Sequence, residues 1–181
     1  EVLVLVGQIG QVFGDESAGD SALATLMDVK APIEDRKIAL AGLVAQKNAK
    51  LPSKLALLID QPIGIQVIRA YSAFDYKGAP RVLLSRYSEL GQEEKSVVIE
   101  TLASRKPYAR ALVAAMGKGK VSKGDIPTYV ARNLQAMLGD SFEKVYGKVQ
   151  AVSADKDKQI AKYKSMVLAS DMSKADASKG R

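Results

Sequence analysis

The chain has 181 residues, of which 47% are hydrophobic and 6% aromatic, and its formal net charge is +7 at pH 7. Such a chain can bury a core, so disorder throughout its length is excluded. It contains no Cys and no His, which excludes disulfides, thiolate nucleophiles, Ser-His-Asp triads and metal centres built on these ligands. What remains is carboxylate, Lys or Tyr chemistry, or binding alone, and we expect no catalytic centre in this chain.

An all-α fold is expected, because a core without Trp must be filled mainly by Leu, Val, Ile and Ala, which suits closely packed helices. Proline marks most of the expected helix starts, since its fixed φ fits the first turn. These prolines are Pro32, Pro52, Pro62, Pro80, Pro107 and Pro127. The expected helices cover residues 32–46, 52–59, 65–74, 80–90, 93–105, 107–116 and 127–138, with a short one before Gly147.

Equivalent apolar residues recur along these helices. In the first helix of each pair they are 31 and 28 residues apart, and in the second 26 and 29 apart. They are Leu43, Phe74 and Leu102 in the first set, and Leu58, Leu84 and Val113 in the second. A two-helix repeat of about 30 residues is typical of an α-solenoid. The sequence therefore predicts a HEAT-like α-solenoid of short antiparallel helix pairs.

We assign residues 1–150 to this helical repeat domain, 151–169 to a C-terminal helix capped by Ser153, and 170–181 to a linker or tail towards a following domain. The core is expected to run through eight apolar side chains: Leu40, Leu43, Leu58, Phe74, Leu84, Leu102, Leu112 and Met116. Four tyrosines should have half-buried rings and hydroxyls in water: Tyr71, Tyr87, Tyr108 and Tyr163.

Two glycine-rich stretches imitate nucleotide-binding motifs. Gly7, Gly10 and Gly14 follow an apolar run, but the next residues are too rich in Gly and Asp for the helix that a dinucleotide site needs. We favour an end helix there, with Leu3, Val6 and Ile9 facing the next helix pair. In the stretch 117–125, GKGKVSKGD, no Gly-Lys is followed by Ser or Thr, so a phosphate-binding loop is excluded and a solvated polar loop is expected.

Charge is distributed unevenly. Residues 1–104 hold 11 basic and 13 acidic residues, whereas residues 105–181 hold 16 basic and 7 acidic ones. Six cations with no acid among them form a possible partner-binding basic cluster: Arg105, Lys106, Arg110, Lys118, Lys120 and Lys123. The cluster lacks the interleaved aromatic residues that stack bases, so we expect an acidic protein surface as its partner and disfavour nucleic acid. A DNA-repair glycosylase of HEAT-like fold is the enzyme alternative, and a free-standing protein-binding solenoid is another.

The stretch EEKSVVIETLASRKPYARALVAAMGKGKVSKGDIPTYVARNLQAML, with the later YGKV and SADKDKQIAKYKSMVL, resembles a known family. It is similar to the helical segment of planctomycete-type multidomain proteins described as heme-binding CxxCH or membrane-bound dehydrogenase-like proteins. The likeness is most specific over residues 80–181, where Leu84-Ser85-Arg86 and Arg132-Asn133-Leu134 echo the family's order. Tyr146 stands where the family is expected to have Trp.

The resemblance implies a non-catalytic spacer between a β-propeller domain and a c-type cytochrome domain, in the same polypeptide or another protein. It implies heme c in an adjacent domain, no cofactor in this chain, and a periplasmic or cell-surface location. The chain begins with Glu1 and ends with Arg181, and we expect it to be a piece of a larger protein that continues into the cytochrome. No segment approaches the roughly 20 apolar residues of a membrane span.

Overall fold

The computed structural model describes residues 16–149 and 164–165. Within these residues every regular element is helical, with nine α-helices, three short 3-10 helices and no strand. The chain divides into two compact units, Glu1–Gly147 and Lys148–Arg181, and the elements named below belong to the first. The predicted all-α class is confirmed. The expected end helix near Leu3, the glycine motif, most of the C-terminal helix and the tail at 170–181 lie outside the described residues.

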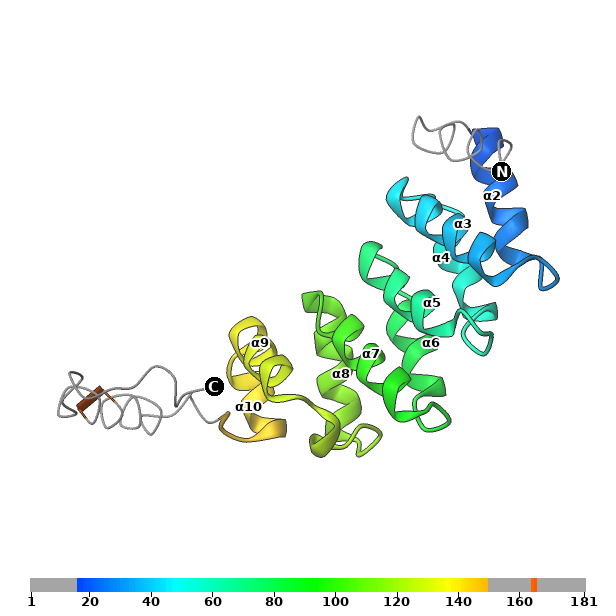
Figure 1. The fold of residues 1–181 in the computed structure, drawn as a ribbon. Coiled ribbons are helices and arrows are strands. Elements are labelled where there is room, and N and C mark those ends of the chain that lie inside the picture. Colours follow the sequence, from blue (N-terminus) through cyan, green and yellow to red (C-terminus); the bar gives the residue numbers. More distant parts are fainter. Residues whose placement is uncertain (1–15, 150–163, 166–181) are drawn as a thin grey trace, which may run out of the picture. The chain divides into compact units, whose positions relative to one another are not determined.

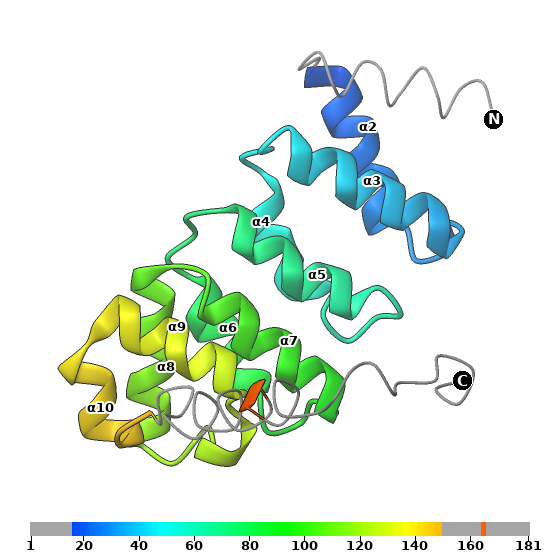
Figure 2. The same cartoon turned by 60° about the vertical axis from the view of Figure 1, so that its left-hand side comes forward.

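The α-helices follow one another through short connections. They are α2 (Glu16–Met27), α3 (Ile33–Ala45), α4 (Leu51–Lys54), α5 (Gly64–Ala70), α6 (Ala79–Arg86), α7 (Gln92–Leu102), α8 (Lys106–Gly117), α9 (Thr128–Leu138) and α10 (Asp140–Tyr146). Helix α2 packs on α3, and α3, α5 and α7 contact one another in turn (Figures 1 and 2). On the other side α6 contacts α8, and α8 contacts α10. The core of this unit lies between these two sets of helices.

Proline and acidic residues mark the helix starts much as expected. Pro52, Pro80 and Pro107 lie in the first turns of α4, α6 and α8, whereas Pro32 and Pro127 are the N-cap residues of α3 and α9. Acidic pairs occupy the first turns of α3 and α7, where they complement the positive end of the helix dipole.

Two predicted helices end early in 3-10 turns. The helix expected at 52–59 is α4 followed by η1 (Leu55–Leu57), and the one expected at 65–74 is α5 followed by η2 (Tyr71–Ala73). In η1, Leu55 is buried whereas Leu57 is 64% exposed. Gly64 opens α5 because a Cβ there would collide with the carbonyl oxygen of Ile59. This tight turn replaces the first-turn proline expected at Pro62.

Seven of the eight predicted core residues are buried: Leu40, Leu43, Leu58, Phe74, Leu102, Leu112 and Met116. The prediction was wrong for Leu84, which is only partly buried. In α6 the buried side chains are Ala79, Pro80 and Leu83, so the apolar face is rotated by one residue from the predicted one. Leu83 and Leu84 are adjacent leucines, and pattern alone could not choose between them.

Helix α3 buries Leu40 and Leu43 as expected, but the rest of its buried face differs from the one the sequence suggested. Ile33 is 45% exposed, while Ala39, expected on the solvent side, is buried. Arg36 is also buried, with 2% exposure. Its Nε donates to the carbonyl oxygen of Leu26 at 3.0 Å, and its Nη2 donates to the Gln61 side chain. These two acceptors replace the hydrogen bonds to water that the guanidinium loses when it is buried.

The three described tyrosines predicted to be half-buried are fully buried instead: Tyr71, Tyr87 and Tyr108. The Tyr108 hydroxyl accepts a hydrogen bond from the Tyr76 N–H at 2.8 Å and donates to the Phe74 carbonyl oxygen at 2.7 Å. Burial raises the pKa of all three hydroxyls above the usual value for tyrosine. These rings are core residues, and the expectation of hydroxyls in water was wrong.

Tyr108 and Tyr71 allow a paired prediction, because the Tyr71 hydroxyl is buried with no hydrogen-bond partner among the described residues. Tyr108→Phe leaves the buried Phe74 carbonyl and the partly buried Tyr76 N–H without this partner, and it should lower the free energy of unfolding by about 1–3 kcal/mol. Tyr71→Phe removes an unpaired hydroxyl and should leave stability unchanged or slightly raised. Urea denaturation followed by circular dichroism measures both. Equal losses in the two variants would contradict the assignment of the Tyr108 hydrogen bonds as a stabilising link.

The loop at 117–125 was expected to be a solvated polar loop, but two of its residues make contacts with the core. Val121 is buried, with 2% exposure, and η3 (Lys123–Asp125) follows it. The Tyr87 hydroxyl donates to Asp125 Oδ2 at 2.9 Å. Val121 and Asp125 therefore attach the loop to the core, while the side chains of its lysines are exposed.

Candidate partner-binding surfaces

Arg105 is already used within the fold. It is the N-cap residue of α8 and is partly buried. Its Nε and Nη2 donate to the carbonyl oxygen of Ser72 at 3.1 and 2.9 Å. The guanidinium therefore links the start of α8 to η2, and it contributes little to a surface that meets a partner.

The other five cations of the predicted cluster are exposed: Lys106, Arg110, Lys118, Lys120 and Lys123. Lys106 and Arg110 lie one turn apart near the start of α8, while Lys118 follows its last residue. Helix α8 has 12 residues, so its two ends are about 18 Å apart. The structure thus divides the predicted cluster into a pair at the start of α8 and a group of three lysines at its end.

Helix α10 adds a cation that the sequence analysis missed. Val145 lies against Gly117, 3.8 Å from where a Cβ on that glycine would be. This contact places the backbone of Lys144, the neighbour of Val145, near the end of α8, and the Lys144 side chain is exposed. Lys144 is 21 residues beyond Lys123 in sequence, and no spacing rule joins the two. We call Lys118, Lys120, Lys123 and Lys144 the α8-end lysines.

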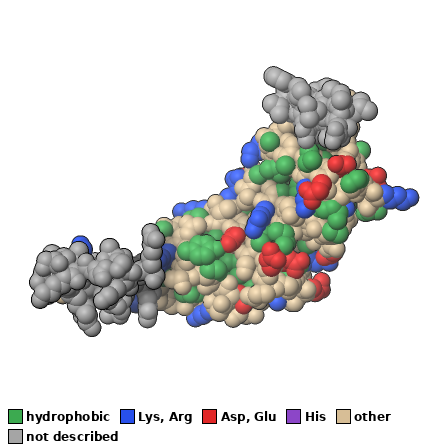
Figure 3. All heavy atoms as spheres, viewed as in Figure 1, with side chains coloured by type: hydrophobic (Ala, Val, Ile, Leu, Met, Phe, Trp, Pro, Cys, Tyr) green, Lys and Arg blue, Asp and Glu red, His purple; other side chains and the backbone are tan. Residues whose placement is uncertain are grey.

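These cations have no carboxylate partner among the described residues. The ion pairs there join Lys37 to Glu34, Lys50 to Asp20, and Arg86 to Asp60 and Glu89. Figure 3 shows Lys and Arg side chains spread across the visible face of the described residues, with no single dense patch. The α8-end lysines can attract an anionic surface, and because they are exposed their effect should be screened by salt.

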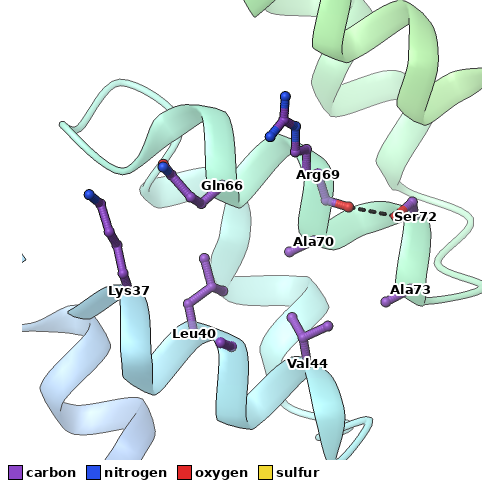
Figure 4. Close-up of a pocket in the computed structure, with 9 residues that line it drawn as sticks. Lys37, Leu40, Val44, Gln66, Arg69, Ala70, Ser72 and Ala73 are labelled. Carbon is purple, nitrogen blue, oxygen red and sulfur yellow. Dashed lines mark hydrogen bonds between the residues drawn. The ribbon is translucent and has the colours of Figure 1, made fainter. Parts of the chain in front are cut away.

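A groove between α3 and α5 is the second candidate surface. Its cavity volume is about 280 Å³. Four lining residues come from α3 and five from α5 and η2: Lys37, Leu40, Ala41, Val44, Gln66, Arg69, Ala70, Ser72 and Ala73. In Figure 4 the side chains of Leu40, Val44, Ala70 and Ala73 lie along the space between the helices, with Lys37 and Gln66 at one end.

Equivalent positions of two neighbouring helices line this groove. Lys37, Leu40, Ala41 and Val44 follow the i, i+3, i+4, i+7 spacing of one helix face, and Gln66, Arg69, Ala70 and Ala73 follow the same spacing. Each member of the second set lies 29 residues after its counterpart in the first. Ala70 and Ala73 are small, which leaves space between the helices. No pattern in the sequence had predicted this groove.

The described residues contain no group of three or more Asp and Glu side chains placed to hold a metal ion. None of the helices in the described ranges is long and apolar enough to cross a membrane. Comparison with protein-family models, curated proteins and solved structures found no match to this chain. The interpretation of these surfaces therefore depends on their own geometry and charge.

Proposed function

We propose that the chain is a non-catalytic helical scaffold, a HEAT-like α-solenoid that holds the groups at its two ends at a fixed separation. One observation carries this proposal. The long-range side-chain hydrogen bonds and ion pairs that join described residues connect positions 25 to 38 apart. This is the length of about one two-helix repeat, so these bonds among the described residues are the ones expected if each helix pair stacks on the next.

Particular links illustrate the pattern. Lys47 Nζ donates to the Ala73 carbonyl oxygen at 2.7 Å, and Asn133 Nδ2 donates to the Ala103 carbonyl oxygen at 3.2 Å. In both, a side chain of one helix pair satisfies a backbone carbonyl at a helix end of a neighbouring pair. In a solenoid, stability is approximately the sum of such nearest-neighbour terms. Direct links between adjacent pairs fix their relative angle, which is the property a spacer needs.

Native-state hydrogen exchange tests the scaffold proposal. Leu134 in α9 is fully buried, and Leu134→Ala should open its own pair and the adjacent α8 while leaving exchange in α2 and α3 unchanged. Mass spectrometry of peptides from both regions measures this. If the variant accelerates exchange equally in α2 and in α9, the unit unfolds as one cooperative body, and the solenoid description is wrong.

The α8-end lysines and the Lys106–Arg110 pair suit an acidic protein surface within this function. Nucleic acid is the alternative, since unpaired lysines can also neutralise phosphates. No aromatic residue belongs to either group, and stacking of bases would need one. We expect no sub-micromolar binding to a random DNA duplex in physiological salt. Such binding, with a steep dependence on salt, would favour the nucleic-acid or DNA-repair alternative.

The parent-protein hypothesis extends the proposal. The resemblance noted for residues 80–181 would place the scaffold before a c-type cytochrome domain and after a β-propeller, in the periplasm or at the cell surface. A fixed separation would then set the distance for electron transfer between those domains. The gene on both sides of this segment decides the matter, because the hypothesis requires a CxxCH motif downstream. A stop codon directly after Arg181 would leave the free-standing protein-binding solenoid.

A further inference from the structure

From the α3–α5 groove we infer that this scaffold binds a short amphipathic helix of a partner protein, with the partner's apolar face in the groove and carboxylates along its flank. The inference rests on the proposed scaffold function, and it names the binding face and the class of partner. It concerns a different surface from the α8-end lysines. Three features of the groove support it: its shape, its polar groups and its charge.

The shape of the groove suits a helix. Its apolar lining comes from Leu40 and Val44 of α3, Ala70 of α5 and Ala73 of η2 (Figure 4). On each side of the groove, the lining residues are spaced by about one helix turn. Residues 37–44 rise by about 11 Å along α3, the length of two turns of a bound helix. A helix placed there would pack its own i, i+3, i+4 side chains against the two existing helices.

One polar group at the groove lacks a partner. Gln66 Oε1 is buried and accepts no hydrogen bond among the described residues. In Figure 4 the Gln66 side chain extends towards the same end of the groove as Lys37. A buried amide oxygen without a donor costs free energy. A partner that brings a donor to this end of the groove would recover that cost.

The charge of the rim is positive. Arg69 is exposed and has no ion pair among the described residues. Lys37 pairs with Glu34 at 2.8 Å, but the two side chains are only three residues apart and the Glu34 side chain is 75% exposed, so a partner carboxylate can share that lysine. Lys47 lies at the other end of the groove, where it binds the Ala73 carbonyl oxygen. Carboxylates on the partner therefore complement the rim.

The chain's own terminal segments fit less well. Residues 150–181 hold 7 basic and 4 acidic residues, so their charge has the same sign as the rim. Residues 1–13 are apolar and contain no basic residue, and they are the internal competitor that an experiment must test. A second copy of the chain is the other competitor.

The test uses the full chain and two labelled peptides in fluorescence anisotropy. The probe is a helical peptide of about 16 residues with Leu and Ala on one face and Glu on its flanks, and its matched control has Lys in place of every Glu. In physiological salt we expect the Glu peptide to bind with a Kd of about 10–100 μM, as suits a small interface, and the Lys peptide at least ~10-fold more weakly.

Three variants separate the groove from general charge. Ala41→Arg fills the groove while adding positive charge, and Arg69→Glu reverses the charge of the rim; each should weaken the Glu peptide by about 10-fold or more. Arg69→Glu should also improve binding of the Lys peptide. Arg81→Glu is the matched control, because Arg81 is exposed on α6 and does not line the groove. It should change the Kd by less than about 2-fold.

Several results would overturn the inference. These are equal binding of the two peptides, equal losses in Arg69→Glu and Arg81→Glu, or no binding at about 1 mM peptide. Binding of the Glu peptide only after removal of residues 1–13 would assign the groove to the chain's own segment. Self-association abolished by Ala41→Arg would assign it to a second copy. Unchanged circular dichroism spectra and the hydrogen-exchange pattern described above keep the scaffold proposal separate, so it can stand where the groove inference fails.

Discussion

Leu102→Ala is expected to lower the free energy of unfolding by about 2–5 kcal/mol, because the substitution leaves a cavity between packed helices. Leu102 is fully buried at the end of α7, and α7 packs against both α5 and α8. Because Leu102 is enclosed on two sides, a small movement of one neighbouring helix cannot fill the cavity that the substitution leaves. The loss should therefore lie well above the cost of removing a leucine from the surface.

Leu57→Ala supplies that surface comparison. The same atoms are removed, but Leu57 is 64% exposed in η1, so the loss should stay within about 0.5 kcal/mol. Urea denaturation of both variants, followed by circular dichroism, gives the two free energies. A loss below about 1 kcal/mol for Leu102→Ala would mean that the helix face assigned to the core of α7 is wrong.

The fold was predictable where the signal was a repeated apolar position. Leu43, Phe74 and Leu102 recur 31 and 28 residues apart, and all three are buried. The choice between Leu83 and Leu84 was not predictable, because the rotation of α6 depends on the helices it meets. Helix ends were also missed where 3-10 turns follow α4 and α5, and the start of α5 was missed because it depends on the close approach of Gly64 to Ile59.

The candidate surfaces were predictable only in part. The cations of the basic cluster are visible in sequence, but its division along α8 and the removal of Arg105 into a hydrogen bond with Ser72 depend on the fold. The groove was missed because the empty volume between two helices is not indicated directly by any residue in the sequence. Its trace is the small size of Ala70 and Ala73, because the residues 29 positions further on are the larger Ile99 and Leu102.

Arg36 is the clearest case of a signal that is present in the sequence but was not used. It stands four residues before Leu40 and seven before Leu43, so it belongs to the buried face of α3 by spacing alone. A charged residue is rarely fully buried without partners, and the sequence does not reveal which groups would pair with Arg36. The partners come from other helices and turns, through the Leu26 carbonyl at the end of α2 and the Gln61 side chain before α5.

Arg36→Ala should lower the free energy of unfolding by about 2–4 kcal/mol, because it removes two charge-assisted hydrogen bonds and the packing of the side-chain stem. Arg36→Met retains the stem without the guanidinium and should lose less. Arg36→Lys retains a charge but places a single nitrogen where two separate acceptors need donors, so it should be no better than alanine.

The matched control for these variants is Arg81→Ala on α6, where the arginine is exposed and has no hydrogen bond or ion pair among the described residues. Its loss should be below about 0.5 kcal/mol. Urea denaturation of all four variants compares the burial of one arginine with the exposure of the other. Equal losses for Arg36→Met and Arg36→Ala would assign the effect to the hydrogen bonds alone. A loss for Arg36→Ala no larger than that of Arg81→Ala would contradict its role as the link between α2, α3 and the turn at Gln61, because a buried guanidinium that holds three segments together cannot be removed without cost.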